Sequence, residues 1–166
     1  METKVTFFDI RKIFIFSGFF LLALIVPFFI HSQWLTGPFV NALLLLISLF
    51  VGPAEAIAIG IIPSTAALSS GLLPLPLAPM VPFIIASNAI FILVFSFLYR
   101  KNFALGVLVA AFLKFIFLLS VSSFLVQRLI AVNWESPASL MMSWPQFVTS
   151  VLGGIIAFFI FQFSKK

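Results

Sequence analysis

The chain has 166 residues, of which 63% are hydrophobic and only 8% are charged, with 24 Phe against 9 Lys and Arg and 4 Asp and Glu. A water-soluble domain needs roughly a quarter of its residues charged to cover its surface. The composition therefore excludes a soluble enzyme, a nucleic-acid-binding domain and a disordered chain, and it predicts an all-α integral membrane protein. Because there is no Cys, a disulfide framework and a thiolate metal site are also excluded.

The apolar runs predict one membrane domain of six transmembrane helices over residues 1–166. About 20 residues are needed to cross a hydrocarbon core roughly 30 Å thick. The approximate spans are 13–30, 39–51, 54–70, 82–98, 103–127 and 144–162. The second and third spans are short, because one helix over 39–70 would run on the order of 48 Å and Gly52-Pro53 supplies a break.

The segment between the third and fourth expected spans, 72–82, is apolar but rich in proline. Repeated proline holds a backbone extended and removes hydrogen-bond donors. We expect a stiff outer loop here, either covering a cavity or simply connecting two helices at the interface.

The positive charges predict the orientation of these helices. Cationic loops face the cytoplasm, so an even number of spans should separate the basic clusters. The clusters are Arg11-Lys12, Arg100-Lys101 and Lys165-Lys166. Four and two expected spans separate them, which places both termini in the cytoplasm and leaves the three tryptophans, Trp34, Trp134 and Trp144, at the opposite interface. The net charge of +5 thus indicates topology rather than a nucleic-acid surface.

Polar side chains within the expected spans gather in the outer leaflet. Such residues are costly in hydrocarbon, so their positions are informative. The candidates for substrate binding are Asn41, Ser64, Thr65, Asn88 and Thr149. A cavity open to the outside would explain this distribution, whereas ordinary hydrogen bonds between helices are the alternative.

Lys114 is the sharpest single feature. It lies about 16 Å into the fifth expected span, near the midplane, where a Lys costs about 2.5 to 3.5 kcal/mol on the insertion scale. It should therefore have a partner, which is either an anionic group of a ligand or an internal structural group. The remaining alternative is that the side chain faces lipid and is accommodated there. Glu55 begins the third span on the cytoplasmic side and is too shallow for a direct pair.

Small residues recur every four positions at Gly52, Ala56 and Gly60 in the third span. Such a face lets another helix approach closely. Packing within the chain explains it, and docking to a partner membrane protein is the functional alternative. The nearby Pro63 removes a helical hydrogen bond, and a broken helix near the midplane is a weak pointer to a transporter site.

Several functions lack the residues that they need. There is no Walker phosphate loop, so the chain does not power transport with ATP by itself. The single His31 has no second His or acid nearby, and no span carries paired carboxylates. We therefore expect no enzyme activity, no metal site and no cofactor.

The chain resembles the substrate-binding S components of energy-coupling factor (ECF) transporters. The resemblance covers most of the chain and is carried by short, moderately specific motifs. These are Thr36 to Ala42 (TGPFVNA), Val51-Gly52-Pro53 leading to Gly60, Pro82-Phe83 with Ser87-Asn88-Ala89, and Trp144-Pro145-Gln146 with Gly153-Gly154.

This resemblance implies a small membrane subunit that captures a vitamin or vitamin precursor from outside. It would deliver the substrate by associating with a coupling subunit and two cytoplasmic ATPases, and would topple within the bilayer as it does so. One feature departs from the family, because Ser17, Gly18 and Ala23 lack the four-residue spacing through which many members dock by the first helix. An MreD-like structural membrane scaffold, whose fold is similar, is the alternative.

Overall fold

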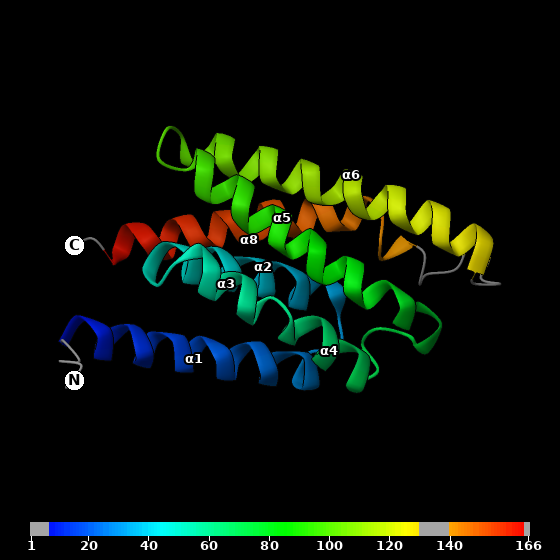
Figure 1. Cartoon of the computed structure of the whole chain (residues 1–166), viewed down its shortest axis with the longest axis horizontal. Coiled ribbons are helices and arrows are strands. Elements are labelled where there is room, and N and C mark those ends of the chain that lie inside the picture. The colour runs from blue at the N-terminus through cyan, green and yellow to red at the C-terminus, as the bar shows by residue number, and fades with distance from the viewer. Residues whose placement is uncertain (1–6, 130–139, 165–166) are drawn as a thin grey trace, which may run out of the picture.

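The computed structural model describes residues 7–129 and 140–164, and every regular element in these ranges is a helix (Figure 1). Five helices are long and apolar enough to cross a membrane. The elements are α1 (Phe7–Phe29), α2 (Gln33–Phe50), α3 (Pro53–Ile59), α4 (Ile62–Ser69), the 3₁₀ helix η1 (Leu75–Met80), α5 (Val81–Leu98), α6 (Phe103–Leu129) and α8 (Trp144–Phe163). The prediction of an all-helical bundle is confirmed for the described residues.

The prediction of where the second helix starts is wrong. α2 begins at Gln33, six residues before the expected Phe39, and runs for 18 residues through Gly37 and Pro38. A proline inside a helix removes one backbone donor and crowds the preceding turn, but Pro38 is buried in the bundle together with Thr36 and Asn41. The helix is therefore long enough to span, and its first two turns belong to the bundle rather than to a loop.

The predicted third helix, 54–70, is two helices. α3 ends at Ile59 and α4 begins at Ile62, with a turn at Gly60-Ile61 between them. Pro63 cannot donate to the carbonyl of Ile59, and its ring would clash with that carbonyl in a continuous helix. Together the two pieces form a shorter apolar segment, Pro53–Ser69, between the long helices.

The sequence predicted an extended loop over 72–82. Part of this proline-rich segment is instead helical. It contains η1, in which the Leu77 amide donates to the Pro74 carbonyl at 2.8 Å. Because proline fixes φ near the helical value, it is tolerated in short 3₁₀ turns. Leu77 and Met80 are buried against residues of α4 and α6, whereas Leu75 is exposed. Part of the apolar character of this segment thus belongs to the core of the bundle.

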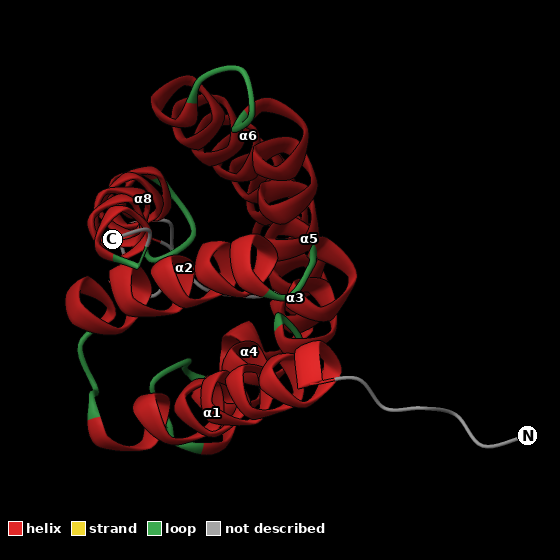
Figure 2. Ribbon diagram, turned by 90° about the vertical axis from the view of Figure 1, so that its left-hand side faces the viewer, coloured by secondary structure: helices red, strands yellow, loops and turns green. Residues whose placement is uncertain are grey.

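α2 forms the centre of the bundle. It packs against α8 on one side and against α1 and α3 on the other, as the end-on view shows (Figure 2). α5 pairs with α6, and α6 also contacts α8. The largest cluster of buried side chains joins α2, α5, α6 and α8, so the four helices that carry the central polar residues are fixed against one another.

The helices run back and forth along the bundle, so the start of α1 and the end of α8 lie at the same end of it. The start of α1, the end of α8 and the turn between α5 and α6 lie at one end of the molecule (Figure 1). The starts of α2 and α8 and the α4–η1 connection lie at the other end, called here the distal end. This arrangement agrees with the even number of crossings that the basic clusters predicted. Two residue groups used in that prediction, the cluster Lys165-Lys166 and the interfacial Trp134, lie outside the described residues.

Candidate functional site

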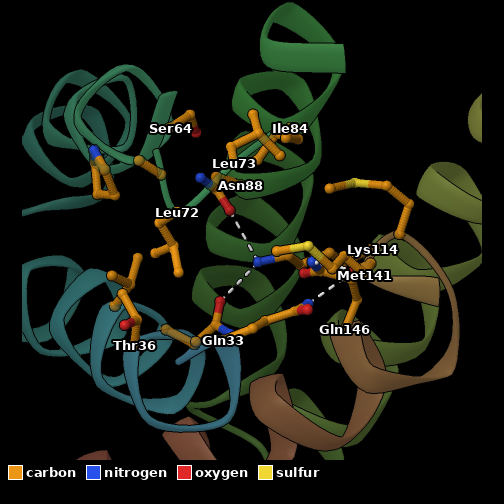
Figure 3. A pocket seen from close by; sticks show the side chains of 16 residues that line it. Gln33, Thr36, Ser64, Leu72, Leu73, Ile84, Asn88, Lys114, Met141 and Gln146 are labelled. Atoms are coloured by element: carbon orange, nitrogen blue, oxygen red, sulfur yellow. Dashed lines mark hydrogen bonds between the residues drawn. The ribbon is translucent and has the colours of Figure 1, made fainter. Parts of the chain in front are cut away.

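A cavity of about 100 Å³ opens toward the distal end between α2, α4, α5, α6 and the start of α8. We call it the inner chamber. Its polar lining residues are Gln33, Thr36, Asn41, Ser64, Asn88, Lys114 and Gln146, and its apolar ones include Leu72, Leu73, Ile84, Met141 and Met142. Figure 3 shows these side chains converging from separate helices.

Lys114 lies at the centre of the chamber. Its Nζ donates to Asn41 Oδ1 at 2.6 Å and to Asn88 Oδ1 at 2.8 Å, and it lies 5.2 Å from the centre of the Phe91 ring. Only 3% of the residue is exposed. The two amides approach the ammonium from α2 and α5, so this one side chain of α6 ties three helices together (Figure 3).

Asn88 also supports the broken helix. Its Nδ2 donates to the backbone carbonyl of Gly60 at 3.2 Å, at the turn between α3 and α4. An asparagine amide has both a donor and an acceptor. Here the NH₂ group donates to the Gly60 carbonyl at the helix break, and the oxygen accepts from Lys114. The break that Pro63 causes is thereby connected to the cation in the chamber.

No carboxylate balances the charge of Lys114 among the described residues that line the inner chamber. Glu55 is exposed at the start of α3 and lies outside the chamber. Amide oxygens and an aromatic face stabilise a buried ammonium only partly, because they supply dipoles and a quadrupole rather than a charge. The described lining therefore offers a basic group and no acid, which favours an anionic ligand over a cationic one.

Ser64 adds a second polar group to the wall. Its side chain is 5% exposed, and its Oγ has no hydrogen-bond partner among the described residues. A buried hydroxyl without a partner costs free energy. Since Ser64 lines the chamber, its hydroxyl is an unpaired polar group in the chamber wall.

The distal rim of the chamber is held by two glutamines that donate to the same carbonyl. Gln33 Nε2 and Gln146 Nε2 each lie 2.8 Å from the carbonyl oxygen of Met141. One comes from the start of α2 and the other from the start of α8. A carbonyl oxygen has two lone pairs and can accept both bonds, so the Met141 backbone is fixed over the opening.

Of the six residues that the sequence suggested for substrate binding, four line the inner chamber: Asn41, Ser64, Asn88 and Lys114. Thr65 is exposed and donates to the carbonyls of Ile61 and Ile62. Thr149 is buried against Gly37, where a Cβ would come within 2.9 Å of it, and lies outside the lining. These two threonines serve helix structure and helix packing.

The small-residue face of the third span is covered by the chain itself. Ala56 is fully buried with residues of α1, α2 and α5, and Gly60 is buried beside Asn88. Gly52 is the residue before α3 and is half-buried. Packing within the chain therefore accounts for the small side chains at Ala56 and Gly60.

Sequence reasoning missed Gln33, Thr36 and Gln146 as lining residues. The first two precede the expected start of the second span at residue 39. Gln146 was noted only as part of the Trp-Pro-Gln motif. The available signal was that Gln33 and Thr36 are polar residues five and two positions before Pro38, because α2 continues through that proline.

Comparison with known proteins found no matching family model, curated protein or solved structure.

Proposed function

We propose that this chain is a substrate-binding membrane subunit of an ECF-type importer, which captures a small anionic micronutrient in the inner chamber. The observation that carries the proposal is the buried Lys114 ammonium in a chamber whose described lining holds no acid. A Lys near the midplane is costly, and its two hydrogen bonds to amide oxygens supply no opposite charge. An anionic ligand would stabilise the ammonium charge and be selected by it.

The position of the chamber supports uptake from outside. The chamber is lined by residues from the starts of α2 and α8 and from the α4–η1 connection, at the opposite end from the α5–α6 turn that carries Arg100 and Lys101. If the basic end faces the cytoplasm, as the distribution of Lys and Arg favours, the chamber faces the exterior. The protein would then be a multi-pass protein of the cell membrane with both termini in the cytoplasm.

Coupling to separate energy-supplying subunits follows from what the sequence lacks. It carries no phosphate-binding loop and no acidic proton relay. A membrane coupling subunit and two cytoplasmic ATPases would supply the work. Because Ala56 and Gly60 are covered, docking would use another surface, and α1, which exposes Phe14, Leu21 and Phe29, is one candidate.

Uptake measurements test the coupling part of the proposal. The chain is expressed in a transport-deficient host with and without an ECF module, and small molecules that co-purify with the detergent-solubilised protein are identified by mass spectrometry. The identified compound should accumulate only when the module is present. Concentrative uptake without the module would point to an autonomous transporter, and a protein that carries and binds no small molecule would point to an MreD-like scaffold.

Affinity measurements test the site. With the identified compound, Lys114→Met should weaken binding at least tenfold, which corresponds to the low end of the free energy of a charged hydrogen bond. Asn88→Ala should weaken it less, because it removes a neutral contact. Lys101→Met is the matched control, since the same change at an exposed residue outside the chamber should leave affinity unchanged.

A further inference from the structure

We propose that the ligand is a ring-bearing monocarboxylate that binds across two chambers, with its carboxylate at Lys114 and Ser64 and its ring against Trp144. The inference rests on the proposed function and specifies the substrate class. It depends on a second cavity, of about 370 Å³, which we call the outer chamber. Its lining residues are His31, Gln33, Trp34, Leu72, Leu140, Met141, Trp144 and Pro145.

The inner chamber offers two donors for a planar acid. A Lys ammonium has three donors, and the two asparagine oxygens accept two of them. The third N–H and the hydroxyl of Ser64, which has no partner among the described residues, remain for a ligand. A carboxylate has two oxygens that accept from separate donors, and the proposal assigns one oxygen to each of these groups.

The number of basic residues in the site matches a ligand with one negative charge. Lys114 is the only Lys or Arg among the described residues that line either chamber. A phosphate carries close to two negative charges near neutral pH and is bound in proteins by clusters of cations or by helix N-termini. A monocarboxylate leaves no uncompensated charge in the chamber, whereas a phosphate monoester would.

The two chambers adjoin at a neck. They share Gln33, Leu72 and Met141 as lining residues. The hydrogen bond from the Gln33 amide to the Met141 carbonyl crosses this boundary at 2.8 Å. The inner chamber, at about 100 Å³, has room for a small head group. The remainder of a larger ligand would therefore pass the neck into the outer chamber.

The outer chamber presents aromatic surface to that remainder. Trp34 and Trp144 pack with their ring centroids 5.4 Å apart and their planes tilted by 50°. They are 48% and 54% exposed, so neither ring covers the other. An aromatic ring of a ligand that packs on such a surface buries apolar area and also adopts a favourable ring–ring geometry. Interfacial anchoring of the helices is the other role that exposed tryptophans have in membrane proteins.

Binding of simple probes separates these contributions. Phenylacetate, 3-phenylpropionate and 4-phenylbutyrate supply one carboxylate, one ring and linkers of increasing length. Their amides remove the charge, and the corresponding cyclohexyl acids remove the aromatic ring. Each is titrated into the purified full-length protein in lipid nanodiscs and followed by calorimetry and Trp fluorescence.

We expect saturable binding for at least one phenyl acid, at least tenfold tighter than for its amide, since a charged hydrogen bond is lost. The phenyl acid should bind about threefold to tenfold tighter than the cyclohexyl acid. Trp144→Leu should abolish the preference for the phenyl ring and keep the preference for the acid. Ser64→Ala should weaken the acid and leave the amide nearly unchanged.

Two control variants test whether these effects are specific to Ser64 and Lys114. Ser150→Ala removes a hydroxyl that is also buried without a partner among the described residues but lies outside both chambers, so affinity should not change. Glu135 lies outside the described residues, and Glu135→Gln removes an acid that could otherwise act as the counter-ion of Lys114. The inference predicts wild-type affinity for this variant.

Failure of the inference is distinguishable from failure of the proposed function. Absence of saturable binding by every phenyl acid, or equal affinity for acids and amides, overturns the inference. So does a Trp144→Leu variant that loses stability but keeps the phenyl preference, because that result assigns the tryptophan to anchoring. A co-purified ligand of another class, imported only with the coupling module, would overturn the inference and leave the proposed function intact.

Discussion

Gly153 of α8 lies directly against Asn41 of α2, and a Cβ added to the glycine would come within 2.6 Å of the asparagine Cβ. The same Cβ would come within 2.8 Å of the Ala42 amide nitrogen and of the Pro38 carbonyl oxygen. The close approach of α8 to α2 therefore fixes the backbone that carries Asn41. Through Asn41 it also fixes the position of the Lys114 ammonium, 2.6 Å away.

Gly153→Ala should separate α8 from α2. Because two of the three nearest atoms belong to backbone, they cannot rotate away, and the overpacking should cost about 1 to 3 kcal/mol of stability. Thermal unfolding of the detergent-solubilised protein measures the loss. Gly18→Ala on α1 is the matched control, since its Cβ would meet nothing within 4 Å. There we expect no loss, or a gain of about 0.5 to 1 kcal/mol from helix propensity.

Asn88→Ala should destabilise the protein more than Asn41→Ala. Each variant removes one acceptor from Lys114, at a cost of about 1.5 to 3 kcal/mol for a hydrogen bond to a charged group. Asn88 makes an additional bond to the Gly60 carbonyl, which adds about 0.6 kcal/mol on the average for hydrogen bonds between membrane helices. Chemical unfolding in mixed micelles measures the difference. Equal losses would mean that the bond to the helix break carries no stability.

Ser64→Ala should stabilise the empty protein. The hydroxyl is buried and finds no partner among the described residues, so its removal relieves a desolvation cost of about 1 kcal/mol. Ser150→Ala should have the same effect on stability for the same reason. Only Ser64 lines the inner chamber, so only its removal should also weaken ligand binding. A loss of stability in Ser64→Ala would show that the hydroxyl has a structural bond.

The sequence predicted the helical membrane class because composition and the lengths of apolar runs determine it. It also identified Lys114 as the central residue, since a cation near the midplane is costly wherever the helices lie. It could not say which residues surround that cation. Asn41 and Asn88 are 73 and 26 positions away along the chain, and their meeting depends on how three helices pack.

Helix boundaries were predicted less well, and the errors involve proline. The sequence predicted a break at Pro53 and the loss of one helical hydrogen bond at Pro63, within a span of 54–70. In the structure, proline breaks the chain at Pro63, begins a helix at Pro53 and is simply included at Pro38. Whether a helix tolerates a proline depends on whether tertiary packing offsets the lost bond, and packing is not visible in a local pattern. Gln33 was missed because it precedes the expected start of the second span, whereas Gln146 lies within the expected span 144–162.

The arrangement of the helix ends predicts a specific topology. The α5–α6 turn, with Arg100 and Lys101, lies at the same end as the start of α1 and the end of α8, and Gly71 lies in the α4–η1 connection at the distal end. Reporters inserted after Asn102 and fused after Lys166 should both report the cytoplasm, and a reporter inserted after Gly71 should report the exterior. Gly71 suits the insertion because it is exposed and lies between helices. If the reporter after Gly71 shares a side with the other two, the segment α3–α4 does not cross the membrane. The chamber would then not open to the outside.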